Sequence, residues 1–193
     1  MKHTSKLLTA LLLTMAFLVS ALPVHGIHAE PETATVQKNA ELVFVIDSTG
    51  SMGDAINNVK TGITSFVNSL ETQGVKLRIG IVEYRDIEED GLDSTIIHEL
   101  NHPWMNSTSE MVGVLGGIAA DGGGDIPESV IDGLGYLVDG ETIPWSSDSY
   151  KFAVVLTDAG YKVANRHGFN SLQEVADALL AAGITTSVVT EES

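Results

Sequence analysis

The chain of 193 residues contains no cysteine. This absence excludes disulfides, thiolate catalysis, cysteine-based zinc sites and a lipid-modified N-terminal cysteine. Basic residues are also scarce: ten Lys and Arg stand against 26 Asp and Glu, and the formal net charge is −16. Such a surface repels nucleic acid and anionic lipid and attracts cations. A secreted domain of this composition must be stabilised by its apolar core or by a bound metal.

Long apolar runs are missing as well, except at the N-terminus. Lys2 and Lys6 precede an apolar run over residues 7–22, and Ala29 ends a stretch of small residues. This order is typical of a secretory signal peptide, since 16 residues fall short of the roughly 20 that span a bilayer. We expect cleavage after residue 29, which removes two Lys and no acid and leaves a charge of −18. An uncleaved membrane anchor is the alternative.

The remaining sequence predicts one secreted domain, residues 41–193, behind a polar lead-in at residues 30–40. Two apolar runs that end in an acid, ELVFVID and KFAVVLTDAG, predict central strands buried on both faces. The predicted strands cover residues 41–47, 75–86, 93–100, 151–160 and 185–190. The third of these is the expected antiparallel hairpin partner of the second.

Amphipathic segments between the strands predict helices. Apolar residues recur at helical spacing over residues 52–70. Ser-x-x-Glu capping boxes at 107–110 and 171–174 open two more helices, and Pro127 suits the first turn of another. This alternation predicts an α/β fold, a three-layer, Rossmann-like sandwich with a mostly parallel sheet and one antiparallel edge strand.

Carboxylates and hydroxyls gather where the predicted central strands end. In such sheets ligands bind beyond the carboxyl ends of the strands, where the strand order reverses, and Asp47 and Asp158 would meet there if their strands are neighbours. Asp47, Thr49 and Ser51 alternate, so a tight loop can direct their oxygens at one point. Oxygen ligands of this kind suit Mg²⁺, Mn²⁺ or Ca²⁺. Alternatively, Thr49 and Ser51 only cap the following helix.

The stretch DSTGSM resembles the von Willebrand factor type A domain family, whose metal-ion-dependent adhesion site has the form D-x-[ST]-x-S. Asp47, Thr49 and Ser51 match that form, and Thr157-Asp158 matches the distal Thr-Asp of the family. YRD and GGGDIPES add to the resemblance, which covers residues 41–190 in element order. It implies a divalent cation, Mg²⁺ first and Mn²⁺ or Ca²⁺ next. It also implies a protein ligand whose acidic side chain completes the coordination.

Two departures from the family pattern bear on the site and on the domain. Many members place a Thr in the middle ligand loop, where this sequence has Asp125 after three glycines. We expect Asp125 to be a further metal ligand; a helix N-cap is the alternative. The usual C-terminal helix also has no counterpart before the sequence ends at VVTEES, so we expect a domain that lacks it.

The segment HELNH matches the H-E-x-x-H signature of zinc metallopeptidases through His98, Glu99 and His102. That chemistry needs both His on one helix face, but the preceding STII favours a strand and Pro103 stops a helix. Four strand steps would separate the two His by about 13 Å, too far to share one zinc. We therefore expect no enzyme. The predicted function is metal-dependent protein–protein or surface interaction, such as adhesion; a metal that only stabilises the fold is the remaining alternative.

Overall fold

The computed structural model describes residues 39–99 and 102–190. The predicted signal peptide and all but the last two residues of the lead-in lie outside these ranges. The first strand begins at Asn39, two residues before the expected start of the domain. Among the described residues, no helix has the length and apolar content needed to cross a membrane.

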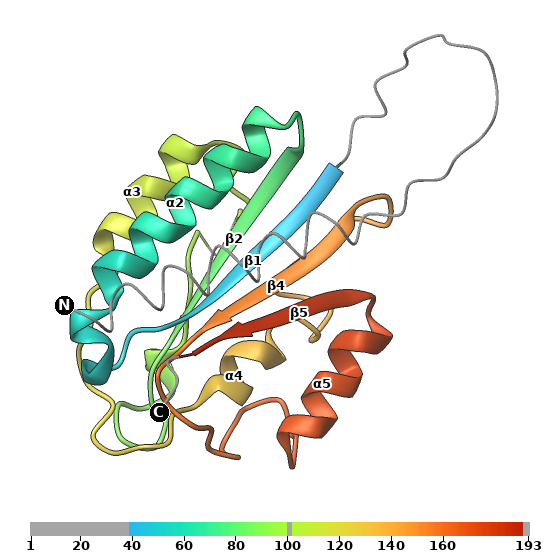
Figure 1. Cartoon of the computed structure of the whole chain (residues 1–193). Helices are drawn as coiled ribbons and strands as arrows, with labels where there is room; N and C mark the ends of the chain where they lie inside the picture. The colour runs from blue at the N-terminus through green and yellow to red at the C-terminus, as the bar shows by residue number, and fades with distance from the viewer. Residues whose placement is uncertain (1–38, 100–101, 191–193) are drawn as a thin grey trace, which may run out of the picture.

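Five strands form one mixed sheet in the order β3-β2-β1-β4-β5 (Figure 1). β1 lies at the centre, parallel to both β2 and β4, and β5 runs parallel to β4. β3 pairs antiparallel with β2 at the edge. The strands are β1 (Asn39–Asp47), β2 (Lys76–Tyr84), β3 (Ile96–Ile97), β4 (Tyr150–Leu156) and β5 (Ile184–Val189). The predicted α/β sandwich with one antiparallel edge strand is confirmed.

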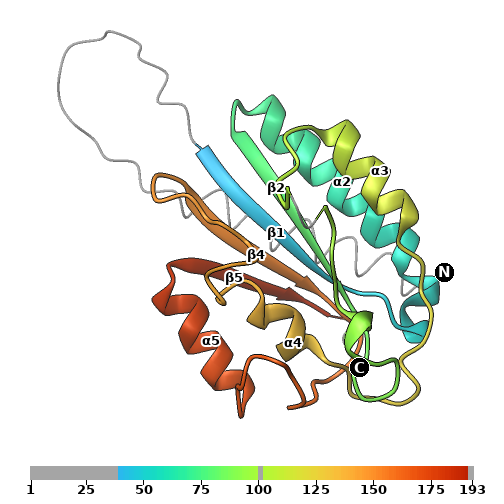
Figure 2. The ribbon, with the colours of Figure 1, turned by 180° about the vertical axis from the view of Figure 1, so that it is seen from behind.

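Helices cover both faces of the sheet, as the two opposite views show (Figures 1 and 2). One face carries α2 (Ile56–Thr72) and α3 (Thr108–Gly117), and the other carries α4 (Val130–Gly135) and α5 (Leu172–Ala181). Short 3-10 helices span Gly50–Asp54 and Leu92–Ser94. α3 and α5 begin as predicted, since the hydroxyls of Ser107 and Ser171 accept backbone N–H bonds from the third helical residue.

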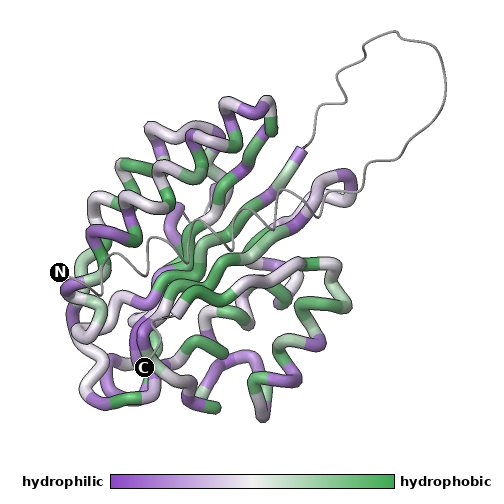
Figure 3. The backbone as a smooth tube through the Cα atoms, in the orientation of Figure 1, coloured by the Kyte–Doolittle hydropathy of each residue, from purple (hydrophilic) through white to green (hydrophobic). Residues whose placement is uncertain are grey.

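The apolar core has two parts, one on each face of β1. Leu42, Phe44 and Ile46 pack toward α2 and α3, whereas Val43 and Val45 pack toward α4 and α5. This strand is buried on both faces because its side chains alternate between two covered layers. Apolar residues follow the strands through the centre of the molecule, and polar ones gather in the connecting loops (Figure 3).

Several elements differ from their predicted bounds; β4, for example, ends at Leu156 rather than at residue 160. Two further differences arise at the loops around the site and at the sheet edge. The helix expected at Pro127 begins at Val130, because the backbone N–H and C=O of Glu128 instead bond Gly160 and Lys162 in a bridge to the loop after β4. Of the hairpin strand expected over residues 93–100, the described residues 93–99 form only the two-residue β3. The chain turns directly after it, where Glu99 adopts a positive φ of 58°.

Candidate metal site at the carboxyl ends of the strands

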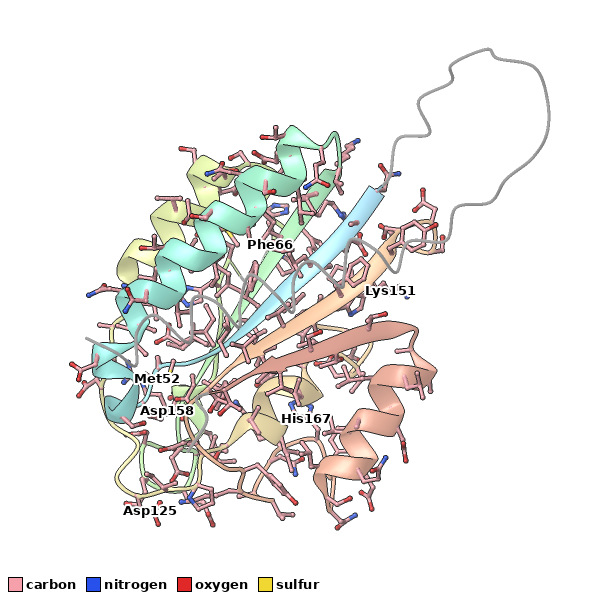
Figure 4. All side chains as sticks on the ribbon, in the orientation of Figure 1. Met52, Phe66, Asp125, Lys151, Asp158 and His167 are labelled. Carbon is pink, nitrogen blue, oxygen red and sulfur yellow. The ribbon has the colours of Figure 1, made fainter. Side chains whose placement is uncertain are left out.

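The carboxyl ends of β1 and β4 bring together the first residues of the predicted site. The two strands pair in parallel with Ile46 opposite Leu156, so the segments that follow them begin side by side. The Ser51 hydroxyl, from the first segment, donates to Asp158 Oδ1, from the second, at 2.9 Å. Figure 4 shows Asp158 at this end of the sheet, close to Met52. Asp47, Thr49, Ser51 and Asp158 therefore form one group.

Asp47 lies at the centre of the group and is fully buried. Its Oδ1 accepts the Thr49 backbone N–H at 3.0 Å and the Thr49 hydroxyl at 2.6 Å. Its Oδ2 accepts the Thr157 hydroxyl at 2.6 Å. Hydroxyls from two different loops thus fix the orientation of the carboxylate.

The group opens from this buried centre toward solvent. Thr49 is buried, Ser51 is exposed and Asp158 is half-buried. The hydroxyl oxygens of Thr49 and Ser51 lie 3.1 Å apart. Neither hydroxyl caps a helix, because the 3-10 helix at Gly50 and α2 both begin without a side-chain cap in the described chain. The capping alternative is therefore wrong, and both oxygens face the carboxylates.

Electrostatics at Asp47 favour an additional positive charge. Burial raises the pKa of Asp47 above its ordinary value, and the nearby charge of Asp158 raises it further, against the hydrogen bonds from Thr157 and Thr49. Within the described residues, no Lys, Arg or His forms an ion pair with Asp47. A bound cation would offset the free-energy cost of burying the ionised carboxylate of Asp47.

The available donors suit a hard divalent cation. Two carboxylates and two hydroxyls supply oxygen only, the ligand type that Mg²⁺, Mn²⁺ and Ca²⁺ prefer. No group of three or more His, Asp or Glu side chains placed to hold a metal occurs in residues 39–99 and 102–190. The Ser and Thr hydroxyls would therefore be needed as ligands, together with water.

Glu128 is a second buried carboxylate beside this group, and the sequence analysis missed it. Its side chain is buried, and its Oε2 has no hydrogen-bond partner among the described residues. A Cβ on Gly123 would lie 3.0 Å from Glu128 Oε1 and 2.8 Å from Thr49 Cβ, so the absence of a side chain at Gly123 leaves room for both of these side chains. The sequence offered a way to find Glu128, since this residue belongs to the GGGDIPES stretch that resembles the family.

The electrostatic environment of Glu128 resembles that of Asp47. Burial raises the pKa of Glu128 to about 8, and the charges of Asp47 and Asp86 act in the same direction. At neutral pH the carboxyl is thus held largely in its protonated form in the metal-free protein. A cation nearby would favour its ionised form.

Asp125, the other predicted ligand, is placed differently. Its exposed carboxylate accepts a hydrogen bond from Lys162 Nζ at 2.7 Å. In Figure 4 it lies at the tip of a loop, below Asp158. The helix-cap alternative for Asp125 is wrong, because the N-cap of α4 is Ser129. Its metal ligation remains a prediction.

The described residues of the HELNH segment, His98, Glu99 and His102, lie outside any helix, whereas zinc peptidase chemistry needs both His on one helix face. His98 and Glu99 lie in the turn after β3, and residues 100 and 101 lie outside the described residues. His98 Nε2 lies 2.9 Å from Glu83 Oε2, so this ring is hydrogen bonded at the sheet edge. His102 is exposed.

A family model for the von Willebrand factor A domain matches residues 41–180. The chain belongs to this family. The match begins within β1 and ends within α5, and it includes every residue of the candidate site.

Two curated proteins that resemble this chain are much longer than it. The chain is 30% identical over 93 residues to the ariadne-like RING finger protein R811 of Acanthamoeba polyphaga mimivirus, covering 48% of this chain and 9% of that protein. It is 26% identical over 121 residues to the alpha-protein kinase vwkA of Dictyostelium discoideum, covering 62% and 18%. It thus spans less than a fifth of either relative.

The fold is also found in a bacterial surface protein. The pilus adhesin SpaC of Lactobacillus rhamnosus GG, in its open conformation, superposes with a TM-score of 0.54 at 13% identity. The similarity covers 78% of this chain and 24% of SpaC. At this identity the similarity shows a shared fold alone.

Proposed function

We propose that this domain binds a divalent cation, Mg²⁺ first and Mn²⁺ or Ca²⁺ next, and uses it to bind a protein or surface ligand. The observation that carries the proposal is the hydroxyl-linked group of Asp47, Thr49, Ser51 and Asp158, centred on a buried carboxylate. A divalent ion would supply the positive charge that this group lacks, and a coordination position open to solvent.

Each residue of the group has a distinct role in this proposal. Asp47 and Asp158 balance the two positive charges of the ion, directly or through water. Thr49 and Ser51 supply hydroxyl oxygens that Asp47 and Asp158 hold in place. Because Ser51 is exposed, the ion would remain accessible from solvent. An acidic side chain of a protein partner would complete its coordination there.

The proposed setting is outside the cytoplasm. The N-terminal sequence with Lys2 and Lys6 before an apolar run supports secretion. The fold shared with a pilus adhesin is consistent with an adhesive role. No catalytic step is proposed.

The first experiment follows thermal unfolding of the metal-stripped protein during titration with Mg²⁺, Mn²⁺, Ca²⁺ and Zn²⁺. A cation that binds only the folded state stabilises it by about 2.7 kcal/mol at a hundredfold excess over its dissociation constant. We expect this stabilisation with Mg²⁺ or Mn²⁺, its loss in Asp47→Asn, and its persistence in the double variant His98→Ala with His102→Ala. Stabilisation by Zn²⁺ alone that is lost with the two His would instead support a metallopeptidase site.

A second measurement separates a ligand-binding ion from one that only stabilises the fold. Water-proton relaxation of the Mn²⁺-loaded protein reports the water molecules that the ion still carries. An acidic peptide should lower this relaxation by displacing such water, whereas its amide counterpart, with Gln for every Glu, should not. Equal responses to the two peptides would contradict carboxylate binding and leave the ion a structural role.

A further inference from the structure

We propose that Lys162 is the counter-ion of Asp125 and prevents this carboxylate from ligating the bound cation. Lys162 thereby sets the affinity of the site for the cation. The inference rests on the proposed function, because it concerns the same ion. It assigns a role to a residue outside the predicted ligand set, and it explains why Asp125 stands apart from the other four residues.

Three carboxylates surround the ammonium group of Lys162. Asp125 Oδ1 lies 2.7 Å from Nζ, Glu88 Oε2 lies 3.7 Å away, and Asp86 Oδ2 accepts a hydrogen bond from Nζ. These carboxylates come from the loop after β2 and the loop before α4. The ammonium of Lys162, which belongs to the loop after β4, therefore joins that loop to the other two at the carboxyl end of the sheet.

The backbone holds Lys162 in this position. Its N–H donates to Glu128 O at 2.7 Å, and the N–H of Glu128 donates to Gly160 O at 3.1 Å. The Lys162 side chain is only 12% exposed, so solvent screens its ion pairs less than those of a surface lysine. The same bridge places the main chain of Lys162 beside Glu128, whose side chain approaches Thr49.

The charges around Lys162 keep the ammonium protonated. Hydrogen bonds to Asp125 and Asp86 raise the pKa of Lys162. Burial alone would raise the pKa of Asp86, but the hydrogen bond from Lys162 lowers it overall, together with backbone and Coulombic contributions. Asp86 and Asp125 thus share the single positive charge of Lys162.

This arrangement has a direct consequence for the metal. With Asp125 bonded to Lys162, the proposed ligand set contributes two carboxylates, Asp47 and Asp158, and their combined charge equals that of a divalent cation. The ion then remains attractive to an external carboxylate. If Lys162 lost its charge, Asp125 would be free to ligate, and a third carboxylate would bind the cation more tightly but leave the site anionic.

The test is calorimetric titration of the metal-stripped protein with Mn²⁺ and with Mg²⁺, comparing the wild-type protein with Lys162→Gln. The glutamine removes the charge and keeps a donor for buried Asp86. We expect the dissociation constant to fall at least about fivefold in Lys162→Gln. It should return to within about twofold of wild type when Asp125→Asn is added to Lys162→Gln.

Two further variants serve as controls. Lys162→Arg keeps the positive charge and should leave the affinity within about twofold of wild type. Lys151→Gln makes the same charge change at the opposite end of the sheet, where Figure 4 shows Lys151, and should also have no effect. Asp125→Asn alone should change the affinity less than about twofold, because Asp125 is not a ligand while Lys162 holds it.

The outcomes separate the two proposals. A wild-type protein that binds neither ion overturns the proposed function. A wild-type protein that binds an ion, with Lys162→Gln binding it no more tightly, overturns only the role of Lys162. If Lys162→Gln does not fold, Asp125→Asn alone decides: a loss of affinity above about fivefold would make Asp125 a ligand in the native protein and overturn the inference.

Discussion

The two ends of β1 each carry a buried carboxylate, and the two carboxylates have opposite environments. Glu41, near the start of the strand, is paired with Arg78 and accepts the Ser146 backbone N–H at 2.8 Å. Although burial alone raises the pKa of Glu41, hydrogen bonds from Ser146 and Arg78 lower it overall. At the other end of the strand, burial and the charge of Asp158 leave the pKa of Asp47 raised.

The difference distinguishes a structural carboxylate from one suited to a cation. Glu41 has its positive charge within the chain, so its negative charge is already compensated in the folded protein. Asp47 is bonded only by neutral donors, the hydroxyls of Thr49, Thr157 and Tyr84 and one backbone N–H, in the described structure. A buried charge that is hydrogen bonded but unpaired is costly, and an added cation offsets this cost.

The largest effect on stability is expected at Glu128. Like Asp47, this carboxylate lacks a paired cation among the described residues. Because its folded pKa, about 8, exceeds the usual 4.5, the folded state binds the proton more tightly than the unfolded state. Stability of the metal-free protein should therefore fall as pH rises from about 4.5 to 8. Glu128→Gln should stabilise it by about 3 kcal/mol at pH 9 and by little at pH 5.

Urea unfolding at both pH values checks this prediction, with Glu141→Gln as an exposed control. An equal effect of Glu128→Gln at pH 5 and pH 9 would contradict it. Adding Mg²⁺ at pH 9 should reduce the advantage of the variant, because the cation favours the ionised carboxylate.

The next effect removes the counter-ion of Glu41. Arg78→Met would give this end of β1 the unpaired state of Asp47, and we expect a loss of about 2 kcal/mol. This is below the usual cost of breaking a buried pair because the Arg78 side chain is 35% exposed. Chemical denaturation measures the loss, with exposed Lys76→Met on the same strand as the control. Equal stabilities of the two variants would show that Arg78 does not compensate Glu41.

The smallest effect on stability is expected at Ser51, on the solvent side of the site. Ser51 is exposed, so Ser51→Ala should change the stability of the metal-free protein by less than about 0.5 kcal/mol. The same change should weaken cation binding about tenfold, since it removes one oxygen ligand. Unfolding and calorimetric titration of the same sample test both, with Ser109→Ala, exposed on α3, as the control. Unchanged cation affinity would remove Ser51 from the proposed ligand set.

The sequence allowed the fold to be predicted because its strongest signals are local. The apolar run ending in Asp47 and the one ending before Asp158 became the central strands β1 and β4, and strand order then brought the two acids together. The alternation of Asp47, Thr49 and Ser51 likewise indicated a loop whose oxygens share one direction. These features depend on spacing within a few residues, or on the general topology of parallel sheets.

The contacts of Glu128 and Lys162 could not be predicted in this way. Both depend on which loops meet at the end of the sheet, and Lys162 reaches Asp86 across 76 positions of the chain. The same loop contact explains why α4 begins at Val130 and not at Pro127. The backbone N–H and C=O of Glu128 bond Gly160 and Lys162, so they do not take part in a helix. Side-chain spacing carries no information on such pairings, and a charge pattern shows only that acids exceed bases.

The hydroxyl links within the site also bear on how quickly an ion could enter. From Thr157 through Asp47, Thr49 and Ser51 to Asp158, each side chain is linked to the next by an O–H group that points at an oxygen. Turning an O–H bond takes picoseconds to nanoseconds and leaves the heavy atoms in place. Loading would then be limited by how fast the ion sheds water, which is slow for Mg²⁺ because it dehydrates reluctantly.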